Sequence, residues 1–317
     1  PRDMERCRDD RSGGVMRYVM VFPHRGLKNY DRWVEDGRFE DAATISEAAG
    51  FDAFMVFDHP LPTDEWMAGG GHHSFDPFVA LSFAAKATTH IKLLTGVLIG
   101  AYRNAYITAK ALASVDKLSG GRVIAGMAAG YLQQEFDALG VGDQFAQRGA
   151  VLDDTIDAMR EVWTGRSMNR PDGRFAAVGM TSLPAPAQDP FPIWIGGNAA
   201  RAARRAVEKG DGWMPGWLPP AVAKSFGTDS LHTLDLMAAR TADAQAKRAS
   251  LGKPPLEIAC SPYEDFRSDW AEGCRAMRKN LGAYEAAGVN WIMVDPPSRS
   301  LSALRDHLTT FADIVLA

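Results

Sequence analysis

The sequence predicts an α/β protein that forms a single (β/α)8 TIM barrel. Short apolar runs alternate with segments of helical period over most of the 317 residues. Glycines stand where the helical segments stop. Repeated strand, helix and glycine stop indicate a parallel sheet with helices outside it. Because there are eight such units, closure into a barrel is favoured over an open sheet.

Eight apolar runs are the predicted strands. Most of their starts are separated by 31 to 44 residues, about the length of one βα unit. They are Arg17–Pro23, Asp52–Phe57, Ile91–Leu98, Arg122–Met127, Pro192–Gly196, Gly212–Pro215, Leu256–Cys260 and Asn290–Val294.

The intervening helices are expected to be amphipathic. Ile107, Ala111, Val115 and Leu118 recur at helical spacing and predict one apolar face. Gly120 then ends this helix, because glycine tolerates the left-handed conformation of a helix cap.

Two insertions interrupt the repeat. One follows strand two and contains three glycines at 69–71; the other separates strands four and five and contains the Pro/Gly-rich segment 165–191. Residues 15–317 are expected to form the barrel domain. Residues 1–14 are expected to be a tail, with Met16 close to the natural start.

Composition excludes several classes of protein. The chain is 46% hydrophobic and 23% charged, with a net charge of −4. It has no apolar run long enough for a membrane span and no basic stripe for nucleic acid. Its three cysteines form no CxxC pair, which argues against a disulfide framework or structural zinc. No signal peptide is visible, so we expect a cytoplasmic protein.

Several familiar catalytic motifs are missing from the sequence. There is no G-x-G-x-x-G, no G-x-x-x-x-G-K-[ST], no G-x-S-x-G and no H-E-x-x-H. The adjacent pair His72–His73 lies in a glycine-rich loop without partners at metal-ligand spacing. We interpret this pair as a solvated loop or the rim of a pocket.

Phe57–Pro60, at the end of strand two, is the most informative segment. A barrel places its chemistry at the carboxyl ends of its strands, so Asp58 and His59 would face the mouth. Histidine can donate or accept a proton near neutral pH. The alternative is that Asp58 only caps the following turn and His59 only packs.

Three further strand ends are candidates. Gly96 in Thr95–Leu98 indicates a bulge, close approach of a ligand, or a simple bend. Gly130–Tyr131 follows strand four, where a helical turn would explain the glycine equally well. The two glycines of Ile195–Ala199 lie between a strand and a helix, where free N–H groups favour an anion.

Together these strings resemble the luciferase-like monooxygenase family, in its branch that depends on the deazaflavin coenzyme F420. The likeness runs from about Met16 to the C-terminus. The strings are E-A-A-G-F-D (47–52), F-D-H-P (57–60), T-G-V-L (95–98), L-S-G-G-R (118–122), G-Y-L-Q-Q-E-F-D-A-L-G (130–140) and I-W-I-G-G-N (193–198).

The resemblance implies an F420 site at the mouth of the barrel. His59 would carry the proton beside the carbon that exchanges hydride, and Tyr131 could polarise a carbonyl or imine, or only pack. A non-proline cis peptide is implied at Gly96–Val97. The residues that would contact the cofactor are Asp58, Thr95, Gly96, Val97, Gly130, Tyr131 and Gln134, with Gly196, Gly197 and Asn198 at its phosphate. Trp66, Trp213 and Trp217 would line an apolar substrate pocket, with core or interface packing as the alternative, favoured for Trp213.

The reaction we expect is hydride transfer between F420 and a small organic substrate. FMN-dependent relatives tend to carry Glu-His-His where this chain has Asp58–Pro60, but an FMN monooxygenase fed by a separate reductase is the main alternative. A metal-dependent hydrolase lacks ligands, and a protein that only binds the cofactor stays open. Some sugar-phosphate dehydrogenases of the branch carry a catalytic glutamate where this chain has Tyr131, which argues against oxidation of a sugar phosphate. Relatives are often dimers, so a homodimer is expected.

Overall fold

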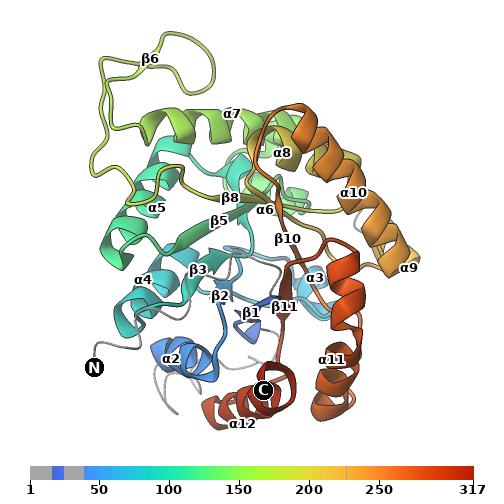
Figure 1. Cartoon of the computed structure of the whole chain (residues 1–317). Helices are drawn as coiled ribbons and strands as arrows, with labels where there is room; N and C mark the ends of the chain where they lie inside the picture. Colours follow the sequence, from blue (N-terminus) through green and yellow to red (C-terminus); the bar gives the residue numbers. More distant parts are fainter. Residues whose placement is uncertain (1–15, 25–38, 226) are drawn as a thin grey trace.

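A closed barrel of eight parallel strands forms the centre of the computed structural model, which describes residues 16–24, 39–225 and 227–317 (Figure 1). The predicted tail, 1–14, and Cys7 lie outside these residues. The barrel strands are β1 (Arg17–Val21), β2 (Ala53–Val56), β3 (Lys92–Thr95), β5 (Val123–Ala128), β8 (Ile193–Gly196), β9 (Gly212–Met214), β10 (Glu257–Cys260) and β11 (Trp291–Val294).

Each strand pairs in parallel with the next, and β1 pairs with β11 to close the ring. The pairing of β3 with β5 joins Leu93 to Val123. The short β4 (Leu98–Ile99) continues the third strand beyond Gly96 and pairs with the end of β5. The predicted (β/α)8 barrel and all eight predicted strands are therefore confirmed, with ends that differ by at most three residues.

Helices surround the barrel on the outside (Figure 1). The chain alternates between these helices and the barrel strands, as expected for βα units. They are α2 (Phe39–Ala49), α4 (Pro77–Ala87), α5 (Ala105–Ser119), α7 (Arg148–Val162), α8 (Ala200–Lys209), α10 (Leu234–Ser250), α11 (Trp270–Ala286) and α12 (Leu301–Phe311), the last followed by η4 (Ala312–Leu316).

The strands divide their side chains between two cores. One set fills the barrel and includes Met55, Leu94 and Met214. The other packs against the helices and includes Phe54, Leu93 and Trp213. This alternation follows from the two-residue period of a strand.

One predicted helical face is wrong. Ile107 and Leu118 of α5 are 72% and 88% exposed, whereas Thr108, Leu112 and Asp116 are buried. Several alanines of this helix are also buried and lie on the side that faces the core. The apolar spacing from Ile107 therefore did not identify the buried side.

The insertions are located as predicted. The first contains α3 (Asp64–Ala68). The second contains α6 (Gln133–Ala138) and η3 (Gly142–Gln147) before α7, and then the hairpin β6 (Asn169–Arg170) and β7 (Ala177–Val178), drawn out to one side in Figure 1. Segment 165–191 packs on α5, where the Tyr106 hydroxyl donates to the carbonyl of Phe175 at 2.5 Å.

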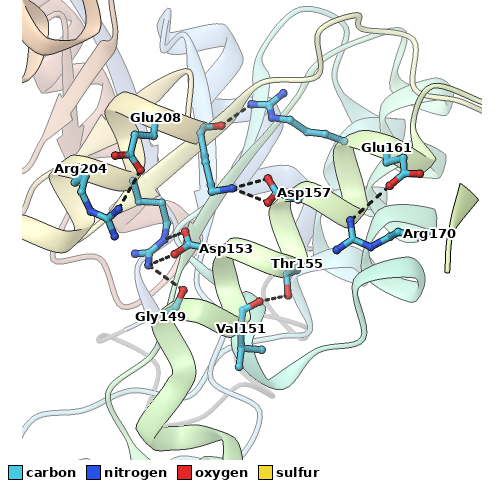
Figure 2. Close-up of polar contacts among 12 residues, drawn as sticks. Gly149, Val151, Asp153, Thr155, Asp157, Glu161, Arg170, Arg204 and Glu208 are labelled. Carbon is cyan, nitrogen blue, oxygen red and sulfur yellow. Dashed lines mark hydrogen bonds and ion pairs between the residues drawn. The ribbon is translucent and has the colours of Figure 1, made fainter. Parts of the chain in front are cut away.

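Ion pairs fix α8 against α7 (Figure 2). The buried Arg205 guanidinium donates to both oxygens of Asp153, at 2.6 and 3.1 Å, and to the carbonyl of Gly149 at 2.9 Å. Lys209 pairs with Asp157, one helical turn further along α7. This bracing holds the helix that begins at the Gly196–Asn198 loop.

Cys260 and Cys274 are free and buried, and burial raises the pKa of each thiol to about 12. Such thiols are unreactive at neutral pH. Among the described helices, none is long and apolar enough to cross a membrane.

Candidate active site

The end of β2 places Asp58 and His59 next to the loops that follow other strands. The Gly96 amide donates to the carbonyl of Val56 at 2.7 Å, so the third strand's bulge lies beside this end. The side chain of His59 contacts groups from the first insertion and from α6. The site is therefore at the carboxyl-end mouth, where the sequence predicted it.

His59 is held on its backbone and on its ring. Its amide donates to the Ser74 hydroxyl at 2.9 Å, and that hydroxyl lies 3.4 Å from its carbonyl. The imidazole lies over Trp66 with ring centroids 4.5 Å apart. A Cβ on Gly71 would lie 2.1 Å from Trp66 Cε3, so Gly71 gives this indole the space it occupies. Trp66 thus lies directly against His59.

Glu135 is the site residue that the sequence reasoning did not assign. Its carboxylate is 2% exposed, and Oε1 lies 3.4 Å from Nδ1 of His59. Its neighbour Gln134, the residue predicted to contact the cofactor, is exposed. The available signal was the glutamate in G-Y-L-Q-Q-E-F.

Two more imidazoles are buried beside His59. His72 is 6% exposed and stacks on Phe57 at 4.6 Å, so the interpretation of this residue as part of a solvated loop is wrong. His24 accepts a hydrogen bond from the Phe57 amide at 3.2 Å. Burial lowers the pKa of His24 well below its usual value, and the neighbouring His72 adds to this. No group of metal-binding side chains with suitable geometry occurs in the described part of the chain.

The Asp58 carboxylate is directed at the protein. It accepts from Arg103 Nε at 3.1 Å, from a terminal Arg103 nitrogen at 2.5 Å and from the Ile99 amide at 3.2 Å. Asp58 does more than cap a turn, because its pair with Arg103 joins the end of β2 to the segment after β4. In this position Asp58 can contribute to a cofactor site by stabilising the segments that form the wall of that site.

The bulge after β3 has the geometry that the resemblance implied. The Gly96–Val97 peptide is cis. A Cβ on Gly96 would lie 2.2 Å from Met55 Sδ, so the bulge packs directly on the barrel interior. The Thr95 hydroxyl is fully buried and donates to the carbonyl of Gly126 at 2.9 Å, which places it inside the wall.

Gly130 and Tyr131 lie at the turn from β5 to α6. Gly130 has φ of +86°, and its carbonyl accepts from Arg148 Nε at 3.1 Å. The Tyr131 ring lies 6.3 Å from the His59 ring and is 39% exposed. Tyr131 therefore flanks His59 without being enclosed.

The loop after β8 is largely engaged within the protein. The Gly197 amide donates to the carbonyl of Met214, and the Gly197 carbonyl accepts from Trp213 Nε1. The Asn198 side chain is 1% exposed and exchanges hydrogen bonds with the backbone of Gly216. Asn198 is therefore committed to joining the loops after β8 and β9.

A phosphate at this loop would meet the first turn of α8 instead. The helix starts at Ala200. The methyl side chain of the preceding Ala199 cannot accept a hydrogen bond, so it does not cap the helix. Amide N–H groups at an uncapped helix start favour an anion. Arg201 adds a positive charge in the same turn.

The three predicted pocket tryptophans have different surroundings. Trp213 is 0% exposed and belongs to the helix-side core, so its assignment to the substrate pocket is wrong. The inward positions of β9 belong to the flanking residues, including Met214. Trp217 lies in the loop after β9, and its buried Nε1 has no hydrogen-bond partner in the described part of the chain.

Comparisons with known proteins identify the family of this chain. The family profile described as "Luciferase-like monooxygenase" matches residues 16–249. The chain belongs to the luciferase-like monooxygenase family.

Curated relatives of this chain include F420-dependent enzymes. It is 29% identical over 177 residues to an F420-dependent glucose-6-phosphate dehydrogenase of Gordonia bronchialis, covering 55% of this chain and 51% of that protein. It is 29% identical over 228 residues to a 5,10-methylenetetrahydromethanopterin reductase of Methanolobus tindarius, covering 72% of this chain and 60% of that protein. The chain thus spans about half the length of the first of these relatives.

Solved structures share the fold. A monooxygenase of Streptomyces bottropensis superposes with a TM-score of 0.74 at 17% identity, over 95% of this chain and 99% of that one. The oxygenating constituent of 3,6-diketocamphane monooxygenase from Pseudomonas putida, in complex with FMN, superposes with a TM-score of 0.70 at 14% identity, over 95% and 98%.

The residues at the mouth fit a flavin-type cofactor. Tyr102, after β4, and Trp217, after β9, each carry a buried polar atom that has no hydrogen-bond partner among the residues the structure describes. Buried donors of this kind ordinarily find a partner. Together with the uncapped start of α8, they supply donors for a large, oxygen-rich anionic group.

Proposed function

We propose that this chain is an F420-dependent oxidoreductase that exchanges a hydride with a small organic substrate. The observation that carries the proposal is the enclosed imidazole of His59, held between Trp66 and Glu135 at the mouth of a luciferase-like barrel. The F420 dependence of the relatives described above supports the choice of cofactor.

When bound, F420 would supply the centre that exchanges hydride. The first turn of α8 would hold its phosphate, and the wall built by Gly96, Val97 and Gly130 would adjoin its ring system. The Tyr102 hydroxyl and Trp217 Nε1 would donate to its oxygens or to those of the substrate.

The protein's own part in the reaction is to position the substrate and handle a proton. Oxidation of an alcohol to a carbonyl releases a hydride from carbon and a proton from oxygen. The His59 imidazole would take that proton, and in the reverse direction it would return it. Tyr131, beside His59 and 39% exposed, would donate a hydrogen bond from its hydroxyl to the substrate oxygen.

The partly buried His59 suits this role, because only 13% of its side chain is exposed. A shielded imidazole exchanges protons with the bound substrate more than with bulk water, and exclusion of water protects the hydride step. Holding the substrate in register supplies much of the rate enhancement.

An FMN monooxygenase is the second candidate, favoured by the fold shared with the FMN-bound structure from Pseudomonas putida. Titration of the purified chain with F420 and, separately, with FMN, followed by fluorescence, distinguishes the two. Tight F420 binding with weak FMN binding is expected. The reverse order would replace the proposal by oxygen-activating flavin chemistry, and binding of neither would overturn both.

A further inference from the structure

Glu135 is a carboxylate buried in a place where burial needs a reason. It is 2% exposed, whereas glutamate is rarely enclosed without a partner. It lies on the short helix α6, which begins at Gln133, and the side chain of the N-cap residue Leu132 makes no capping hydrogen bond. Its neighbour Phe136 is 0% exposed and meets the rings of Tyr102 and Phe145, each at 5.2 Å. This packing fixes the rotation of α6, and thereby the direction of the Glu135 side chain.

The partner of this carboxylate in the described part of the chain is His59. Oε1 lies 3.4 Å from Nδ1, and the two side chains are 3% and 13% exposed. Two arginines on adjoining segments are occupied elsewhere: Arg103 pairs with Asp58, and Arg148 donates to the carbonyls of Gly130 and Phe145. The His59 imidazole is thus the group that pairs with the Glu135 carboxylate.

We propose that Glu135 is the positioning residue of His59 and fixes which of its nitrogens carries the proton in the neutral ring. This rests on the proposed function. An ionised carboxylate only accepts hydrogen bonds, so the nitrogen that faces it must be Nδ1–H. Nε2 then carries the lone pair and is the atom that accepts a proton from the substrate. No hydrogen bond between Nε2 and another described residue competes for that atom.

The surroundings of the pair keep it in one arrangement. Trp66 covers a face of the His59 ring, and His72 meets it edge-on at 5.3 Å. Tyr131 lies on a further side, and Tyr102 and the Asp58–Arg103 pair are the other titratable groups close by, with His24 beyond His72. Because the ring cannot turn freely, its two nitrogens have distinct tasks.

The first test reads the tautomer of His59 directly. In protein labelled with ¹⁵N-histidine, the His59 signals are assigned by their loss in His59→Asn, without cofactor or substrate. We expect neutral His59 as the Nδ1–H form, although Nε2–H is the form that free imidazole side chains prefer in water. A dominant Nε2–H form in the unmodified chain would overturn the proposal.

Glu135→Gln then removes the charge with little change of shape. We expect a mixture of tautomers, because the amide can both donate and accept, and a fall in kcat of about 10- to 1,000-fold with the cofactor Kd changed less than about threefold. In a His59→Asn background the same substitution should cost no further activity. Asp137→Asn, an exposed acid of the same helix, is the matched control and should leave the tautomer and kcat as they are.

Lost activity with an unchanged tautomer in Glu135→Gln would make Glu135 a structural residue and overturn the proposal. The tautomer measurement needs no ligand, so it stands whichever cofactor binds. Failure of F420 to bind would overturn the proposed function alone.

Discussion

The guanidinium of Arg103 forms a bidentate pair with the carboxylate of Asp58. Its Nε lies 3.1 Å from Oδ2, and a terminal nitrogen lies 2.5 Å from Oδ1. The Asp58 side chain is only 2% exposed. Burial acts to lower the pKa of Arg103, but the hydrogen bonds and charge of Asp58 outweigh it and raise that pKa. The pair therefore fixes the residue directly before His59.

Asp58→Asn is expected to lower the free energy of unfolding by about 3–5 kcal/mol, because it leaves the largely buried Arg103 charge without its counter-charge. Urea unfolding followed by circular dichroism measures this. The matched control is Asp243→Asn, which breaks the exposed pair with Lys247 on α10 and should cost less than about 1 kcal/mol. Equal losses of unfolding free energy in the two variants would show that the Arg103–Asp58 pair contributes no more than an exposed ion pair.

His59→Asn is expected to reduce kcat by about 10²- to 10⁴-fold, the usual contribution of a positioned acid or base. Cofactor affinity should change little, because the proton carrier is not the group that holds the phosphate. Steady-state kinetics and a fluorescence titration on the same preparation separate the two. A large loss in both would argue that His59 holds the cofactor and would remove its assignment as the proton carrier.

The strand ends that form the mouth could be predicted because the repeat of the barrel fixes where chemistry lies. Strand ends at Asp58, Gly96, Gly130 and Gly196 follow from counting βα units. Which side chain of each end points inward could not be predicted so well. Because side chains alternate along a strand, Trp213 and Met214 face opposite sides of β9. Met214 points into the barrel and Trp213 packs against the helices, the reverse of a pocket assignment for Trp213.

The rotation of short helices escaped prediction for a similar reason. Gln134 and Glu135 are adjacent, and α6 is too short for its own period to show which of them faces the mouth. The choice is made by Phe136, through its packing on Tyr102 and Phe145. The contact with Tyr102 joins segments that are distant in sequence, so a local pattern does not contain it.

Gly126 of β5 lies close to the backbone of the neighbouring strand β3. A Cβ there would lie 2.1 Å from the carbonyl oxygen of Thr95 and 3.0 Å from Met214 Sδ. Because the first of these atoms is backbone, Gly126→Ala is expected to cost about 3 kcal/mol or more of the free energy of unfolding.

The control for Gly126→Ala is Gly282→Ala in α11, where nothing lies within 4 Å of the new methyl group. This variant should gain about 0.5–1 kcal/mol, because alanine loses less conformational freedom in a helix. Denaturation midpoints that move the same way in both variants would contradict the close approach of the strands.

The buried His24 predicts how the stability of the fold depends on pH. Burial lowers the pKa of this imidazole well below 6.5 in the folded chain, and the neighbouring His72 and His59 act in the same direction. In the unfolded chain His24 titrates near 6.5. Below that pH the unfolded state binds the extra proton, so the stability that His24 contributes is complete above about pH 6.5 and is lost as the pH falls.

His24→Gln keeps an acceptor for the Phe57 amide and removes the titration. Between about pH 6 and pH 5, the free energy of unfolding of the unmodified chain should fall more steeply than that of the variant, by up to about 1.4 kcal/mol per pH unit. Urea unfolding at a series of pH values gives both slopes. His90→Gln, which changes an exposed histidine, should keep the original slope. If His24→Gln also keeps it, His24 is protonated in the folded chain, and its buried, neutral state is ruled out.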